Sequence, residues 1–181
     1  MDRRQKKTRQ AVYRSFTALL ETKPYSAISV QEIIDGADVG RSTFYAHFET
    51  KDALLESLCQ EIFDHVFSNE LTSEASHDFS DRARDLRAEL THILYHLQDD
   101  RTFVRRILAR ESGELFMRYF KRRLEGVFAR ELEGCVSDVP QDYLLHHMVC
   151  DFAETVRWWM DRGGYPPEEV CRFFLSTTPF A

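Results

Sequence analysis

Apolar residues recur along this chain of 181 residues at intervals of three and four, which is the spacing of amphipathic helices. The first such segment carries Val12, Phe16, Leu19 and Leu20 on one face and ends before Pro24. No stretch alternates apolar and polar residues for long enough to predict a strand. The pattern therefore predicts an all-α fold.

Two short helices follow the first segment. Ser29 and Glu32 have the spacing of a capping box, which predicts a helix that starts after Ser29 and ends near Gly36. After a tight connection at residues 38–40, a second short helix is expected at about residues 41–47.

The pattern also predicts helices in the rest of the chain. A longer helix at residues 51–67 would link an N-terminal domain (residues 1–50) to a C-terminal domain (residues 68–181), with the boundary in the polar, aperiodic residues 68–80. Further helices are expected at five places: about residues 86–97, after Asp100, after Ser112, after Pro140 and from Pro166-Pro167. The expected total is about nine.

Composition is that of a folded protein, with 43% hydrophobic and 30% charged residues. The apolar stretches are too short to cross a membrane, and the charged start at residues 1–7 leads into no apolar segment, so we expect neither a membrane helix nor a signal peptide. The four cysteines form no CxxC pair, which favours free thiols in the cytoplasm.

The net charge of −6 is unevenly spread. Residues 1–50 hold eight basic and six acidic residues, whereas the rest of the chain is acidic. A basic segment on an acidic body indicates an interaction surface, although a solvated helix would show the same charges.

Two short helices joined by a turn that contains glycine, between two longer helices, form a helix-turn-helix pattern. The second short helix would fit the major groove of DNA and expose Arg41, Ser42, Thr43 and Tyr45. Arginine commonly reads guanine, hydroxyls bind bases or phosphates, and the N–H groups that open the helix at Ser29 would favour a phosphate. The alternative is a generic three-helix module with Tyr45 as a surface aromatic.

The segments Ser29–Ile34, Gly40–Phe48 and Lys51–Leu54 resemble the DNA-binding domain of the tetracycline-repressor (TetR) family, and the likeness extends from about Arg9 to Leu58. The resemblance implies a homodimeric transcriptional regulator, usually a repressor that a small ligand releases from operator DNA. It implies that four residues bind or orient the DNA backbone: Thr43, Tyr45, His47 and Lys51. It implies that two residues face base edges: Arg41 and Ser42.

The connection between the short helices departs from the family pattern. Asp38-Val39-Gly40 replaces the common Gly-Val-Ser, so the usual hydroxyl cap is missing. Glycine can take that N-cap position at a loss of a few tenths of a kcal/mol.

The segments 151–160 and 165–169 resemble a recurrent C-terminal region of TetR-type regulators. The apolar seam of the last two helices predicts a four-helix bundle with a second copy. Its members are Leu145, Val149, Phe152, Val156, Trp159, Val170, Phe173 and Phe174. The alternative is an ordinary core within one chain.

An effector pocket would lie on the middle helices. Six apolar residues are candidates for its lining: Phe103, Leu108, Phe116, Met117, Phe120 and Trp158. Arg105, Arg106 and Arg110 could meet an anionic effector or form a solvated face. In a second interpretation the body binds another protein instead of a small molecule, and an exposed apolar patch would favour that.

Other chemistry has weaker signals. His92 and His96 share a helical face but have no neighbouring carboxylate or Cys at ligand spacing. His147 shares a face with Cys150 or Asp151, where the adjacent apolar seam indicates core or interface instead. We therefore predict no metal or cofactor. A metal sensor, or a thiol switch through Cys150 or Cys171, is a third variant. No GxSxG, P-loop, GxGxxG or HExxH motif occurs, so an enzyme is not expected.

Overall fold

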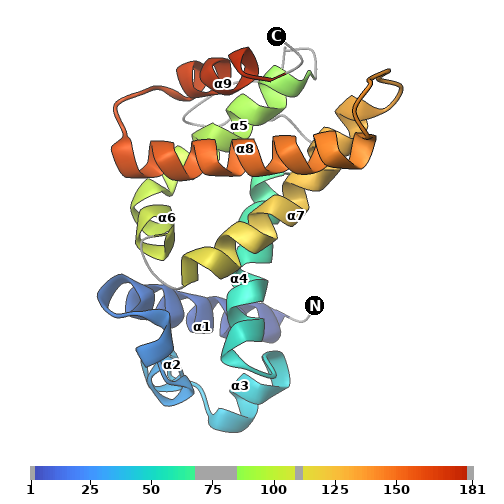
Figure 1. Ribbon diagram of the computed structural model, residues 1–181. Coiled ribbons are helices and arrows are strands. Elements are labelled where there is room, and N and C mark those ends of the chain that lie inside the picture. The colour runs from blue at the N-terminus through green and yellow to red at the C-terminus, as the bar shows by residue number, and fades with distance from the viewer. Residues whose placement is uncertain (1–2, 68–84, 109–111, 179–181) are drawn as a thin grey trace.

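The computed structural model describes residues 3–67, 85–108 and 112–178 (Figure 1). The described residues contain nine α-helices and one 3-10 turn, η1 (Tyr25–Ala27), and they contain no strand, so the predicted all-α fold is confirmed. The helices are α1 (Arg3–Thr22), α2 (Val30–Ala37), α3 (Arg41–His47), α4 (Lys51–Val66), α5 (Leu86–Asp99), α6 (Arg101–Leu108), α7 (Ser112–Leu132), α8 (Gln141–Arg162) and α9 (Pro167–Ser176). The predicted boundary at residues 68–80 lies outside the described residues.

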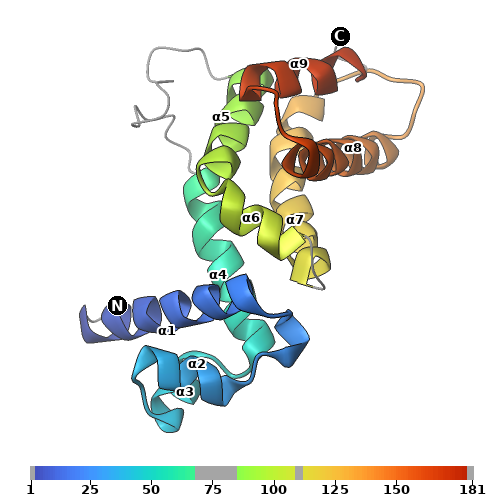
Figure 2. The ribbon, with the colours of Figure 1, turned by 90° about the vertical axis from the view of Figure 1, so that its left-hand side faces the viewer.

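Helices α1, α2 and α3 gather at one end of the molecule, and α5 to α9 form a body at the other (Figures 1 and 2). Helix α4 runs through both parts. Its C-terminal half enters the body, where the ring of Phe63 lies 4.9 Å from that of Phe116 and 5.5 Å from that of Phe120. The same helix therefore belongs to the short-helix unit and to the core of the body.

Helix α8 ends at Gly163, whose φ of +69° favours glycine, and the chain turns back into α9. The indole Nε1 of Trp159 donates a 2.9 Å hydrogen bond to the carbonyl of Tyr165 across this turn. Pro167 begins α9 at the position where its missing N–H has no cost.

The apolar seam of α8 and α9 is covered by its own chain. Six of its predicted interface residues are at most 4% exposed: Val149, Phe152, Val156, Trp159, Val170 and Phe174. Phe152, for example, packs on Phe128 of α7 and on Phe174 of α9, at ring distances of 6.2 and 5.0 Å. These six residues form the core of one chain, which corrects their assignment to a dimer interface; Leu145 and Phe173 are half-buried.

Within the described residues, no helix has both the length and the apolar character that crossing a membrane requires.

Candidate nucleic-acid interface

Helix α2 begins with the predicted capping box. The Glu32 N–H donates to the Ser29 hydroxyl, and the Ser29 N–H donates to the Glu32 carboxylate, at 3.3 and 2.9 Å. An ion pair with Lys23, together with the bonds from Ser29, lowers the pKa of Glu32 to about 2. The capping box therefore occupies the N–H groups of Ser29 and Glu32, and the phosphate contact expected at this helix start remains a prediction.

Helix α2 lies very close to α1 at Gly36. A Cβ atom added at Gly36 would lie 2.4 Å from the hydroxyl oxygen of Ser15. That buried hydroxyl donates a 2.8 Å hydrogen bond to the carbonyl of Ile33. The absence of a side chain at Gly36 thus allows α1 to support α2.

The turn between α2 and α3 depends on Asp38, which has left-handed backbone angles (φ 53°, ψ 48°). Asp is one of the few residues other than glycine that tolerate this region. Gly40 is the N-cap of α3 and provides no side-chain hydrogen bond, as its sequence position predicted.

Helix α3 is anchored by one buried side chain and exposes its polar residues. Phe44 is fully buried and packs against Phe48 at a ring distance of 5.7 Å. Four residues that were predicted to meet DNA are exposed: Arg41, Ser42, Thr43 and Tyr45. Tyr45 is 48% exposed, and its ring meets that of Phe44 edge-on. The face of α3 therefore presents one guanidinium, two aliphatic hydroxyls and one phenol together.

Gln31 of α2 holds the guanidinium of Arg41, and Asp35 of the same helix holds the Gln31 amide. Arg41 Nη2 donates to Gln31 Oε1 at 3.0 Å, and Gln31 Nε2 donates to Asp35 Oδ1 at 2.8 Å. Sequence reasoning missed Gln31, because ten residues separate it from Arg41 and no local spacing relates the two.

Lys51 joins α4 to the turn before α2. Its ammonium donates to the carbonyls of Tyr25 and Ile28, both at 2.7 Å, and lies 4.2 Å from the centre of the Tyr25 ring. The hydroxyl of Tyr25 in turn donates to Asp52, and burial together with this bond raises the pKa of Tyr25. Lys51 thus holds this loop in place, and its contact with a phosphate remains a prediction.

His47 is half-buried at the end of α3, and its ring lies 6.2 Å from that of Phe48. The structure therefore places His47 beside the core, and its contact with the DNA backbone also remains a prediction.

A polar network that sequence reasoning missed joins α1 to α4. Arg9 Nη2 donates to the Tyr13 hydroxyl and to Ser57 Oγ, both at 2.6 Å, and the two hydroxyls lie 2.8 Å apart. Burial raises the pKa of Tyr13, so this phenol stays neutral. The only signal in the sequence was the spacing of Arg9 and Tyr13 on one helical face.

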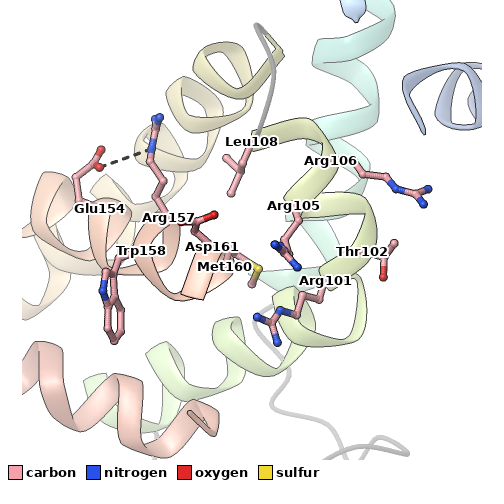
Figure 3. Close-up of a pocket in the computed structure, with 10 residues that line it drawn as sticks. All are labelled: Arg101, Thr102, Arg105, Arg106, Leu108, Glu154, Arg157, Trp158, Met160 and Asp161. Carbon is pink, nitrogen blue, oxygen red and sulfur yellow. Dashed lines mark ion pairs between the residues drawn. The ribbon is translucent and has the colours of Figure 1, made fainter. Parts of the chain in front are cut away.

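The predicted effector residues do not line one pocket. Phe116, Met117 and Phe120 are buried in the core, and Phe103 is half-buried against it. Leu108 and Trp158 line an open hollow of about 870 Å³ between α6 and α8 (Figure 3). Arg105 and Arg106 also line it, whereas Arg110 lies outside the described residues.

The histidine candidates pair with neighbours. The Nε2 atoms of His92 and His96 lie 3.0 Å apart and both residues are buried. His146, not His147, contacts Cys150, with its Nε2 atom 3.6 Å from Sγ, which corrects the expected pairing. In the part of the chain that the structure describes, no three His, Cys, Asp or Glu residues form a group that could hold a metal ion.

The cysteines differ in exposure. Burial raises the pKa of the Cys171 thiol, which disfavours the reactive thiolate there. Cys150 is half-buried, and its Sγ atom lies 3.7 Å from Lys121 Nζ.

Comparison with known proteins agrees with this architecture. The family model for bacterial regulatory proteins of the tetR family matches residues 16–58, and a model for a transcriptional regulator C-terminal region matches residues 84–178. The crystal structure of a TetR transcriptional regulator from Streptococcus agalactiae 2603V is 33% identical, with a TM-score of 0.76, over 97% of this chain and 95% of that one. This chain belongs to the TetR family of transcriptional regulators.

Other relatives match over less of their length or at lower structural similarity. The uncharacterized HTH-type transcriptional regulator YxbF of Bacillus subtilis (strain 168) is 35% identical over 71 residues, which are 36% of this chain and only 19% of YxbF. The structure of the dihydroxyacetone kinase operon activator DhaS has a TM-score of 0.62 at 20% identity, over 93% of this chain and 92% of DhaS, and shares the TetR fold. Membership in the TetR family agrees with the expectation that the chain is a regulator and not an enzyme.

Proposed function

We propose that this TetR-family chain is a cytoplasmic homodimer that binds operator DNA through α3 and acts as a repressor released by a small-molecule effector. The observation that carries the proposal is the exposed face of α3. Its guanidinium, hydroxyls and phenol project from a seven-residue helix whose only fully buried side chain is Phe44.

The roles within this face follow from the chemistry of each group. The guanidinium of Arg41 can make the bidentate contact with guanine that reads sequence, and Ser42 lies beside it. Thr43 and Tyr45, with Lys51 at the start of α4, would bind phosphates and set the register of α3 in the groove.

Dimer formation would use the surface of α8 and α9 that remains exposed, not their buried seam. Trp158 and Tyr165 are 40% and 42% exposed and stack at a ring distance of 5.6 Å. The half-buried Phe173 meets Tyr165 edge-on at 5.3 Å. We name these three residues the aromatic patch. A two-fold axis through it would join both α8–α9 pairs and set the separation of the two α3 helices.

The test is binding to the duplex upstream of the gene for this protein, against a scrambled duplex, across a series of salt concentrations. We expect preferential binding that weakens steeply with salt. Arg41→Gln should relax the base preference, whereas Tyr45→Phe should weaken binding to all sequences alike. Equal, weak binding to both duplexes would contradict the proposal for this operator.

The same duplex in a transcription assay tests the sign of regulation. Repression is expected from the family, but the fold neighbour DhaS is named an operon activator. Increased transcription on addition of the protein would therefore overturn the repressor assignment and leave the DNA-binding assignment intact.

A second function has one observation in its favour. The aromatic patch is an exposed apolar surface, whereas three of the predicted pocket residues, Phe116, Met117 and Phe120, are buried in the core. A body that binds another protein would use such a patch. A stable homodimer in which the patch is covered would argue against this alternative.

A further inference from the structure

Four arginines line the hollow between α6 and α8. Arg101, Arg105 and Arg106 of α6 line one side, and Arg157 of α8 lines the other (Figure 3). Its volume of about 870 Å³ lies within the range of small-molecule sites, roughly 300–1,000 Å³.

Two of these four arginines are already neutralised by carboxylates. Arg106 pairs with Glu21 of α1 at 3.0 Å, and Arg157 pairs with Glu114 of α7 at 3.1 Å. The Nε atom of Arg157 is nevertheless buried without a hydrogen bond, because the Glu154 carboxylate lies 3.6 Å away. One donor on this wall is therefore unsatisfied.

Arg101 and Arg105 form no ion pair with any described residue. Figure 3 shows both side chains extending from α6 toward the end of α8, where Asp161 lies; the other carboxylate of the lining, Glu154, pairs with Arg157. Arg101 and Arg105 are thus the two guanidiniums of the lining that no ion pair with a described residue occupies.

The position of Arg101 depends on the backbone of Gly163. A Cβ atom at Gly163 would lie 2.2 Å from Arg101 Nη2, so any side chain there would displace the guanidinium. Gly163 therefore ends α8 and also leaves the space that Arg101 occupies. The Arg101 side chain is half-buried and lies beside the Gly163 backbone.

We propose that this hollow binds a small organic anion, whose carboxylate lies between Arg101 and Arg105. Leu108, Met160 and Trp158 supply an apolar wall for the rest of the molecule. Guanidinium groups suit this ligand because they bind carboxylates through paired N–H donors. That this anion is the effector rests on the proposed function.

Helix α6 also connects this site physically to the DNA-binding end of the molecule. Arg105 and Arg106 are neighbours in sequence but point in different directions, Arg105 into the hollow and Arg106 toward α1 (Figure 3). An anion bound by Arg105 therefore acts on the same helix that contacts Glu21. A shift of α6 would alter the support of α1 without any contact between ligand and DNA.

The test is a calorimetric titration of the full chain, without DNA, with 1-naphthoate and with its neutral analogue 1-naphthamide. We expect naphthoate to bind at least about tenfold more tightly, because only its carboxylate forms charged hydrogen bonds with the guanidinium groups. Arg105→Gln and Arg101→Gln should each weaken naphthoate about tenfold by the same reasoning. Arg118→Gln, an equal change of charge on the exposed face of α7, should leave it unchanged.

Three results would overturn the proposal: equal binding of the acid and the amide, no binding of naphthoate at millimolar concentration, or equal effects of Arg105→Gln and Arg118→Gln. Arg105 is exposed, so its substitution leaves the fold intact, and a thermal melt checks this for Arg101→Gln. Operator binding is measured separately. Operator binding without naphthoate binding refutes only this inference, and the reverse result refutes only the proposed function.

Discussion

The carboxylate of Glu21 lies 3.0 Å from the guanidinium of Arg106, and this ion pair joins the last turn of α1 to α6 of the body. Both side chains are more than two-fifths exposed, so solvent screens the pair. Its importance lies in its position, since it ties an end of the DNA-binding unit to the body at a place remote from α4.

Arg106→Gln should loosen the end of α1 without unfolding the protein. Because the pair is exposed, we expect the free energy of unfolding to change by less than about 0.5 kcal/mol. Hydrogen exchange of the amides in the last turn of α1 should become faster, and Arg118→Gln should not have this effect. Unchanged exchange in the Arg106→Gln variant would show that the pair does not support α1.

Gly36→Ala should destabilise the DNA-binding unit, because the added methyl group would lie 2.4 Å from the Ser15 hydroxyl oxygen. We expect a loss of about 1–2 kcal/mol in chemical denaturation, as for overpacked sites in general. The double variant Ser15→Ala with Gly36→Ala removes the oxygen and should recover much of that loss. Simple addition of the two single effects would refute the steric explanation.

Asp38→Gly should stabilise the protein, because glycine adopts positive φ without the steric cost that other residues meet. We expect a gain of about 0.5–1 kcal/mol, and a loss of similar size for Asp38→Ala. Asparagine tolerates the same backbone angles, so Asp38→Asn removes only the charge. It therefore separates the effect of backbone strain from the effect of a carboxylate near DNA, measured as operator affinity.

The pKa of Glu32 predicts a dependence of stability on pH. Its pKa falls from 4.5 to about 2 on folding, so the unfolded chain binds this proton more readily than the folded one. The stabilisation is therefore complete above the unfolded pKa and is lost as pH falls from about 4.5 toward 2. Glu32→Gln should flatten the stability profile in this window, whereas Glu49→Gln should not. Identical profiles for the two variants would contradict the prediction.

Phe173→Glu should weaken the proposed dimer, because it introduces a charge into the aromatic patch. Sedimentation should then show a larger monomer fraction at a given concentration. Val136→Glu is the matched control, since Val136 is fully exposed in the loop between α7 and α8. A dimer that dissociates equally in both variants would place the interface elsewhere.

The first fifty residues were predictable from sequence because local signals decide them. The capping box at Ser29, the glycine at position 40 and the buried Phe44 all act within a few residues of the elements they specify. The exposure of Arg41 and Tyr45 then follows from helical geometry alone. Contacts over longer distances, such as Gln31 with Arg41, lack any such local signal.

The body was predicted less completely, for a physical reason. Periodicity shows that Val149, Phe152 and Val156 share an apolar face, but it does not show which chain covers that face; here α7 and α9 of the same chain do. Similarly, adjacent arginines look alike in sequence. Only the packing of α6 between α1 and α8 gives Arg105 and Arg106 different surroundings.

Because α4 is one continuous helix, a tilt at its body end displaces its other end. Sixteen residues of helix are about 24 Å long at 1.5 Å per residue, so a tilt of about 5° at the body end moves the other end by about 2 Å. In a two-fold dimer the displacements of both protomers combine, and the distance between the two α3 helices would change by up to about 4 Å. Since successive major grooves are about 34 Å apart, a change of this size in the dimer would take the two helices out of register with DNA.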